Sequence, residues 1–334
     1  MSAPTNYEPF LPWENLPSQV DAEYRPDDRS GRLYHYDERL RFVTEVAIVT
    51  HRPLLLRGEP GAGKSSFAPF VARNLNWRYY EQTVTGRTEA KDLLWRFDAL
   101  RRLRDARDPD RQADLSAEKY VTPGPLWWAF NRAEALRVAS LRSGSPEGSA
   151  SLETFAEVNQ GRDPLRAVVL IDEIDKADPN VPNDLLEVLG TNRFCVEEAD
   201  LLVDRELTKD VAGQHGSLLT VITTNEERDL PAAFLRRCVV YTIGEPEGQS
   251  DKLRRLEEIA GLHMKPLIAS RERGADMVKA VAEKCLQLRE GAKKQQRRGP
   301  SIAEYLDAVR FCLARGLSPE DPQWEVVQKS VLLK

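Results

Sequence analysis

The stretch Gly58-Glu59-Pro60-Gly61-Ala62-Gly63-Lys64-Ser65 decides the fold of this chain. A glycine, four further residues and then Gly-Lys-Ser match the phosphate-binding P-loop pattern in full. An apolar run of strand length, residues 53–57, comes directly before the stretch, and residues 65–75 can begin a helix after it. This strand–loop–helix order is the context that the pattern requires, so it favours a phosphate site over an ordinary glycine-rich turn.

Each residue type in this loop has a chemical role in binding an oligophosphate. Glycines let the backbone approach closely, and successive N–H groups then point at the phosphate oxygens. The helix that follows presents its positive N-terminal end to the same anion. Lys64 would reach the β- and γ-phosphates of ATP, and the Ser65 hydroxyl would ligate Mg²⁺. We therefore predict that residues 58–65, together with Ser66, bind ATP.

A second motif, Val168-Val169-Leu170-Ile171-Asp172-Glu173, predicts the other half of a magnesium–nucleotide site. Four consecutive apolar residues are typical of a strand that is buried on both faces of a parallel sheet. Two carboxylates follow at its carboxyl end, where open α/β sheets bind their ligands. Asp172 would hold Mg²⁺, and Glu173 would polarise the water that attacks the γ-phosphate. A strand that merely ends in acidic residues is the alternative, and the P-loop makes it less favoured.

A third apolar run, residues 218–224, is followed by Asn225. If this strand neighbours the one that ends at Asp172, Asn225 lies beside the two carboxylates and can orient the attacking water. On its own, an asparagine at this place would be read as a simple strand terminator. The prediction for Asn225 therefore depends on the order of strands in the sheet.

The composition limits the classes of function. The 334 residues are 41% hydrophobic and 30% charged, as in globular proteins, and suffice for one large domain or two. A net charge of −5 gives no overall sign of binding to nucleic acid or acidic membranes. No apolar run approaches the ~18 residues of a membrane span, and the N-terminus lacks a secretory signal. The four cysteines and four histidines show no metal-site spacing, so we expect buried, reduced thiols and a cytoplasmic location.

The order of expected elements indicates an α/β core followed by a small helical domain. We expect an N-terminal tail at 1–36, a P-loop core with a central parallel sheet at 37–245, and a helical lid at 246–334. Further strands are expected near residues 77–84, 193–197 and 239–243. A helix is expected from Asp178-Pro179 to Gly190, with Asp178 as its cap.

These motifs, in this order, resemble an AAA+ ATPase, and within that superfamily the MoxR branch, over roughly residues 37–334. Leu230-Pro231-Ala232-Ala233, which leads to Arg236-Arg237, is similar to the arginine-finger helix of that branch, and Gly124-Pro125-Leu126 is similar to its Gly-Pro-apolar element. MoxR proteins usually have an acidic residue before the finger arginine and Phe after it, where this chain has Arg236 and Cys238. Arg237 is therefore the first candidate for the finger, and Arg236 is the second.

The resemblance also implies where other elements of the family lie. Residues 88–125 would include an insert that faces the pore of a ring, and residues 191–217 would carry the pre-sensor hairpin. The sensor 2 arginine of the family falls near a Pro-Ser start to a lid helix. This chain has Pro300-Ser301 with no arginine just after the serine, so either Arg297 or Arg298 substitutes for it or the role is absent.

Three functions remain open from the sequence. The resemblance implies a homo-oligomeric, hexameric ring that uses ATP and Mg²⁺ to remodel or activate a partner protein, as a chaperone does. In MoxR-type proteins that partner often carries a von Willebrand A domain. A nucleic-acid motor or loader of a restriction or defence complex is the second interpretation. Its main support, the basic run at residues 293–298, is more simply a solvated surface. A nucleotide-gated assembly switch in signalling or antiviral defence is the third.

Overall fold

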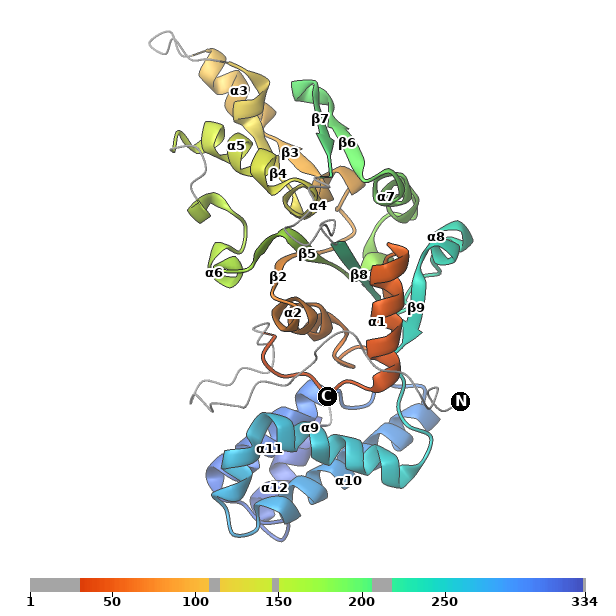
Figure 1. The fold of residues 1–334 in the computed structure, drawn as a ribbon. Coiled ribbons are helices and arrows are strands. Elements are labelled where there is room, and N and C mark those ends of the chain that lie inside the picture. Colours follow the sequence, from red (N-terminus) through yellow and green to blue (C-terminus); the bar gives the residue numbers. More distant parts are fainter. Residues whose placement is uncertain (1–30, 108–114, 146–149, 206–217, 333–334) are drawn as a thin grey trace. The chain divides into compact units, whose positions relative to one another are not determined.

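The computed structural model describes residues 31–107, 115–145, 150–205 and 218–332 (Figure 1). By their internal contacts, the described residues form two compact units. The first unit takes in Glu38–Arg57 and Val71–Thr242, and the second takes in residues 31–37, Gly58–Phe70 and the chain from Ile243 onward. Residues 1–30 of the expected tail lie outside the described residues, and the domain bounds given above stay predictions. No helix in the described ranges is long and apolar enough to cross a membrane.

The first unit contains a five-stranded parallel sheet. Its strands, in spatial order, are β2 (Trp77–Thr83), β5 (Asp163–Asp172), β8 (Leu218–Thr224), β1 (Leu54–Arg57) and β9 (Val239–Thr242). Strands β8 and β1 are almost wholly buried, and so is the second half of β5 up to Asp172, as their apolar runs indicate. The sheet confirms the P-loop fold class that the sequence predicted.

The register of the inner strands brings three chain segments to one edge of the sheet. β5 pairs with β8, with Leu170 opposite Val221, and β8 pairs with β1, with Thr224 opposite Arg57. Because these strands are parallel, their carboxyl ends lie at the same edge. Asn225 follows β8 there, and Gly58 follows β1, so the condition on which the prediction for Asn225 depended, that the second and third strands are neighbours, is met.

Helices and two short antiparallel ladders complete the first unit. The longer elements are α1 (Glu38–Thr50), α5 (Arg132–Ser143) and α7 (Asn180–Thr191), and α2 (Lys64–Asn74) begins in the second unit. The shorter helices are α3 (Ala99–Ala106), α4 (Pro125–Phe130), α6 (Ala156–Asn159) and α8 (Ala232–Arg237). The ladders pair β3 (Trp95–Phe97) with β4 (Val121–Pro123), and β6 (Arg193–Val196) with β7 (Leu201–Asp204).

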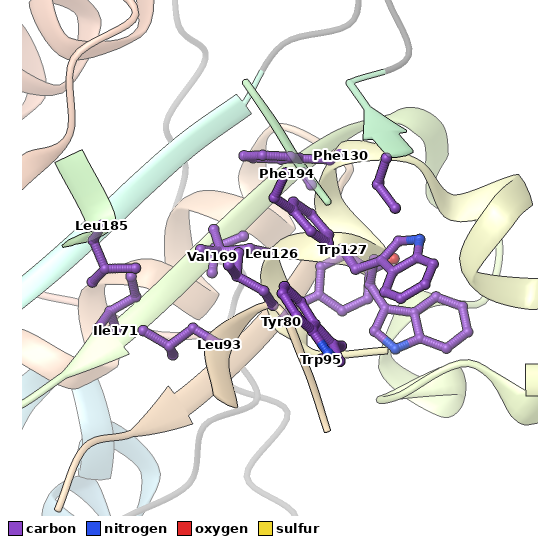
Figure 2. Close-up of a cluster of buried hydrophobic side chains, with 14 of the residues drawn as sticks. Tyr80, Leu93, Trp95, Leu126, Trp127, Phe130, Val169, Ile171, Leu185 and Phe194 are labelled. Carbon is purple, nitrogen blue, oxygen red and sulfur yellow. The ribbon is translucent and has the colours of Figure 1, made fainter. Parts of the chain in front are cut away.

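Aromatic side chains fasten both ladders to the core of the first unit (Figure 2). The ring of Phe194, on β6, stacks on Trp95 of β3 with centroids 5.6 Å apart and meets Trp127 of α4 edge-on at 5.7 Å. Trp95 Nε1 also donates to the Glu198 carboxylate at 2.8 Å. The described part of the predicted hairpin (191–217) therefore packs against the described part of the predicted insert (88–125).

Gly124 explains why a strand precedes α4 where the sequence indicated only a proline–glycine turn. Its N–H donates to Leu94 O at 2.8 Å, and a Cβ at this position would lie 2.7 Å from Leu93 C. Only glycine permits this approach. The close contact continues the β3–β4 ladder to Gly124, the residue that caps α4.

The second unit is helical beyond the P-loop. It contains α9 (Gln249–Ala269), α10 (Gly274–Lys294), α11 (Ile302–Arg315) and α12 (Pro322–Val327) around a core of its own. Ser301 caps α11 by a capping box in which its side chain accepts the Glu304 N–H and the Glu304 carboxylate accepts the Ser301 N–H. After α12, residues Gln328–Leu332 form a π-helical turn.

Four details of the sequence prediction were wrong. Pro179, not Asp178, is the capping residue of α7, and the Asp178 carboxylate instead accepts the Asn180 N–H at 3.0 Å. The helix passes through Gly190 and ends where Asn192 takes the left-handed conformation (φ 55°). β5 begins at Asp163 and is longer than its apolar run. Cys195 is exposed, because it lies on the outward side of β6, whereas the other three cysteines are buried.

The buried carboxylate of Glu153 joins three elements of the first unit, β2, α5 and α6. Glu153 accepts hydrogen bonds from Arg78 Nη1 at 2.6 Å and from Arg132 Nε at 2.8 Å. The Tyr80 hydroxyl (2.8 Å) and Asn159 Nδ2 (3.1 Å) also donate to it. Burial, and then the charge of Glu153, raise the pKa of Tyr80, so its hydroxyl stays a donor. Glu153 thus ties β2, α5 and α6 together.

Replacing Glu153 by glutamine is expected to destabilise the protein by about 3–5 kcal/mol, because two arginines would lose their buried counter-charge. Urea unfolding monitored by circular dichroism measures this. Glu157→Gln, on the exposed side of α6, makes the same change of charge nearby and should shift the midpoint little. Equal midpoints for the two variants would show that Glu153 has no special role.

Candidate functional site

The carboxyl edge of the sheet places Asp172 and Glu173 beside a threonine of the neighbouring strand. The Thr223 hydroxyl donates to Asp172 Oδ1 at 2.6 Å and accepts the Glu173 N–H at 2.8 Å. Thr223 is fully buried, and Asp172 is only 4% exposed. One hydroxyl therefore fixes both the carboxylate of Asp172 and the backbone of Glu173.

Two side chains hold the Glu173 carboxylate. Asn225 Nδ2 donates to Glu173 Oε1 at 3.2 Å, and Lys176 Nζ donates to Oε2 at 2.7 Å. The hydrogen bond to Glu173 raises the pKa of Lys176, so this lysine is charged at neutral pH. Glu173 itself takes a left-handed backbone conformation, with φ 61° and ψ 49°. For a residue other than glycine this conformation is strained and is typical of functional sites.

Asp175 fixes the loop that carries Asn225. Its Oδ2 accepts the backbone N–H groups of Asn225 at 3.1 Å and of Glu227 at 3.0 Å. Asp175 is only 3% exposed, and these two bonds hold its Oδ2 in place. The position of the Asn225 amide thus depends on a carboxylate from the segment that follows β5.

Glycines shape the loop at residues 58–65. Gly58, Gly61 and Gly63 have φ angles of 146°, 77° and 89°, which residues with a Cβ rarely adopt. A Cβ on Gly61 would lie 2.5 Å from the Ser301 Cβ, at the cap of α11. Lys64 is buried, and its Nζ donates to the carbonyl oxygens of Gly58 and Glu59 at 2.6 and 2.9 Å. The loop is therefore a backbone cradle whose lysine is folded over it.

An aromatic residue outside the motif lies against this cradle. Tyr34 is 7% exposed, and its ring contacts Phe67 and Phe70 of α2 with centroids 5.3 and 5.5 Å away. Its Cε2 lies 3.5 Å from where a Cβ on Gly63 would be. Burial raises the pKa of Tyr34, so the phenol is neutral. The residues just before α1 thus support the helix that follows the loop.

The candidate finger arginines, Arg236 and Arg237, lie just before the start of β9, at the edge of the sheet where the strands begin. α8 ends at Arg237, and Val239, which begins β9, donates its N–H to Pro53 O at the start of β1 (2.8 Å). A four-residue strand is about 13 Å long, and the three strand spacings from β9 to β5 add about 14 Å sideways. Arg236 and Arg237 are exposed, and neither forms an ion pair with any described residue. They do not reach the carboxylates of their own chain.

The structure thus brings together part of the predicted site. Asp172, Glu173 and Asn225 meet, whereas Arg236 and Arg237 lie apart from them. In the helical unit, Arg298 Nη2 lies 3.6 Å from the Glu304 carboxylate, and Arg297 is exposed. Three contributors were missed by sequence reasoning: Thr223, Asp175 and Lys176. Only the spacing of Lys176, three residues after Glu173, could have indicated its contact.

The residues present fit a magnesium–nucleotide complex. The cradle of the P-loop leaves no room for a Cβ at Gly61, and its backbone groups suit phosphate oxygens. Ser65 and Asp172 offer the oxygen donors that Mg²⁺ prefers. The described residues hold no cluster of three or more acidic, histidine or cysteine ligands.

Comparisons with known proteins give a family. The model described as AAA domain (dynein-related subfamily) matches residues 53–238 of the 334, more than half of the chain. No curated protein matches. Among solved structures, a point mutant of RuvB from Thermotoga maritima is 13% identical, with a TM-score of 0.47 over 90% of this chain and 71% of that one. A candidate ATPase from Cytophaga hutchinsonii is 14% identical, with a TM-score of 0.39 over 92% and 84% of the two chains. On its family match and its sheet, this protein belongs to the dynein-related subfamily of AAA domains.

Proposed function

We propose that this protein binds ATP with Mg²⁺ and hydrolyses it at the interfaces of a homo-oligomeric ring, as a MoxR-like member of the AAA+ ATPases. One observation carries the proposal. Thr223 joins Asp172 to the backbone of Glu173, and Asn225 donates to the Glu173 carboxylate at 3.2 Å. A metal ligand, a base and an amide donor thus meet at the edge of the sheet from which the P-loop departs.

Each of these residues then has a role in hydrolysis. The backbone of residues 58–66 and the Lys64 ammonium would hold the phosphates, and Ser65 and Asp172 would hold Mg²⁺. The metal ion would supply positive charge to the β- and γ-phosphates. Glu173 accepts a proton from the attacking water, and Asn225 orients that water. Thr223, Asp175 and Lys176 position these groups without contacting the nucleotide.

The arginine at the far edge of the sheet serves a neighbouring subunit. Arg237, or Arg236 in its place, lies too far from the Glu173 of its own chain to act there. Both side chains are exposed at the end of α8, where a second copy can receive them. AAA+ proteins commonly form rings, and a hexamer is the assembly that we propose.

The ring uses the energy of hydrolysis to remodel or activate a partner protein. The resemblance to MoxR proteins favours this role. A protein with a von Willebrand A domain is a candidate for the partner. The basic run at residues 293–298 supports a nucleic-acid motor instead, because its side chains are exposed at the end of α10. With a net charge of −5 we prefer the protein partner.

A trap variant separates these functions. Glu173→Gln, loaded with ATP, is expected to hold a protein partner that wild-type protein releases on hydrolysis. Recovery of nucleic acid instead, lost steeply as salt rises, would favour the motor. Slow wild-type turnover with ATP-dependent assembly and no bound partner would favour a nucleotide-gated switch.

Gly61→Ala is expected to weaken ATP binding by at least about tenfold. The new Cβ would meet the Ser301 Cβ at 2.5 Å in a backbone conformation that costs alanine about 1–2 kcal/mol. Fluorescence titration with an ATP analogue measures the affinity. Gly144→Ala is the matched control, because Gly144 has φ 68° with nothing within 4 Å of its Cβ position. Equal affinities in the two variants would contradict the role given to Gly61.

Thr223→Val is expected to lower the rate of ATP hydrolysis by about 10- to 100-fold and to leave ATP affinity within a few-fold of wild type. The substitution keeps the shape but removes the bond to Asp172, and the Glu173 N–H loses its acceptor. Thr220→Val, on the same strand, is the control, and Thr223→Ser should restore the rate. An unchanged rate of hydrolysis in Thr223→Val would show that this hydroxyl is not needed to position Asp172 and Glu173.

A further inference from the structure

A pocket of about 260 Å³ lies in the first unit, away from the motifs that bind and hydrolyse nucleotide. It is formed where α3, β4, α4 and α5 meet the chain around residues 152–154. Its lining residues are Arg101, Thr122, Pro123, Trp128, Ala139, Arg142, Ser143, Leu152 and Thr154. The volume is several times the roughly 30 Å³ share of one water molecule, and it is below the roughly 300 Å³ of the smallest drug-sized sites.

Two buried donors among the lining residues have no acceptor. Arg142 Nε and Trp128 Nε1 are both buried and make no hydrogen bond to the described part of the chain. Trp128 as a whole is only 3% exposed. A buried donor without an acceptor is costly, so such groups normally have a partner. Both atoms are closed off from solvent, so an occupant with acceptor oxygens reaches them only if the side chain of Arg142 or Trp128 moves.

The charges around the pocket favour an anion. Arg101 Nη2 donates to the Arg142 carbonyl oxygen at 3.3 Å, which brings two arginines to the same wall. Among the described residues, Arg142 has no carboxylate within ion-pair distance, and Arg101 has only Asp105 at 4.0 Å. The nearest buried carboxylate in sequence, Glu153, already pairs with two other arginines. The described carboxylates therefore do not balance the positive charge of the two arginines at the pocket.

The rest of the lining suits a small ligand. Hydroxyls of Thr122 and Thr154 add polar groups, and Pro123, Ala139 and Leu152 make an apolar wall. The Ser143 hydroxyl already donates to the carbonyl oxygens of Ala139 and Ser140. Arginine guanidinium groups bind carboxylate and phosphate oxygens through two parallel bonds. We propose that this pocket binds a small oxyanion, a carboxylate or phosphate group on a short apolar carrier. No motif in the sequence assigns such a site, and it is independent of the proposed ATP hydrolysis.

The test is isothermal titration of the full chain with inorganic phosphate and, separately, with acetate, at constant ionic strength. Lys64→Ala is the background, so that the P-loop does not take up phosphate. We expect one or both anions to bind with a stoichiometry of one. Arg142→Gln should weaken that binding at least about tenfold, since it removes a charged donor. Binding of phosphate alone assigns a phosphate ligand, and binding of acetate alone assigns a carboxylate.

Matched variants keep the test decisive. Arg104→Gln removes the same charge from an exposed position on α3 outside the pocket. The Lys64→Ala protein that also carries Arg104→Gln should bind the anion with the same affinity as Lys64→Ala alone. Arg101→Gln is the second pocket variant, used if Arg142→Gln lacks a native circular dichroism spectrum. In the Lys64-intact protein, neither pocket variant should change ATP affinity more than twofold. No binding of either anion, or equal weakening by Arg104→Gln, overturns the proposal.

Discussion

The Glu173→Gln variant is expected to bind ATP as wild type does and to hydrolyse it about 10²–10⁴ times more slowly, as for loss of a general base. Glutamine keeps the shape of the side chain and can still accept from Asn225, but it has no carboxylate to take a proton. It also loses the ion pair with Lys176, which is 2.7 Å long in the wild-type protein. Binding of a fluorescent ATP analogue and release of phosphate measure the two quantities separately.

The control for Glu173 is a carboxylate close to it in space. Glu227 is exposed in the loop after β8, and its backbone N–H donates to Asp175. Glu227→Gln makes the same change of charge and should hydrolyse ATP at the wild-type rate. If Glu173→Gln turned ATP over normally, another group would have to act as the base. If it failed to bind ATP, its defect would lie in the site as a whole.

The second large effect is expected for Arg237→Ala, which should lower hydrolysis in the assembled protein by about 10³–10⁵, the range for an arginine supplied in trans. This side chain lies at the opposite edge of the sheet from Glu173 and cannot serve its own chain. Assembly and ATP binding should persist, because Arg237 is exposed on a short helix and has no buried partner among the residues that the structure describes. Arg236→Ala, one residue away, is the comparison that tells which arginine acts.

Mixing two inactive variants tests the same geometry. In a ring that contains both, an Arg237→Ala subunit keeps its Glu173, and a Glu173→Gln neighbour keeps its arginine. Some interfaces then have a complete site, so hydrolysis should return on mixing. If Arg237→Ala and Arg236→Ala were both fully active, the finger would lie elsewhere in the chain. Mixtures that stay inactive would contradict a shared site.

The sequence predicted those features that short motifs and apolar runs encode. The P-loop, the strand before Asp172 and the strand before Asn225 are each local, so their elements were found. Their order in the sheet stayed open in the sequence, and only the pairing of β5 with β8 settles it. The ends of elements were less predictable, because they depend on local competition. Asn192, in the left-handed conformation, ends α7 in place of Gly190, and β5 extends back to Asp163.

Contacts between distant residues could not be predicted. Thr223 looks like any threonine of a buried strand, and only the pairing of β5 with β8 places its hydroxyl on Asp172. Asp175 reaches a loop that is 50 residues later in the chain. The Glu153 cluster and the Arg101–Arg142 wall likewise depend on how insert and core pack. Single residues at such separations leave no periodic signal.

The central claim is that hydrolysis requires a site completed by a neighbouring subunit, and the rate per subunit as a function of protein concentration tests it most directly. Phosphate release should be measured across the range in which light scattering reports the change from monomer to ring. The rate of hydrolysis per subunit should rise as the ring assembles and should be close to zero for the monomer. A rate per subunit that is the same at dilutions where the protein is monomeric would contradict it.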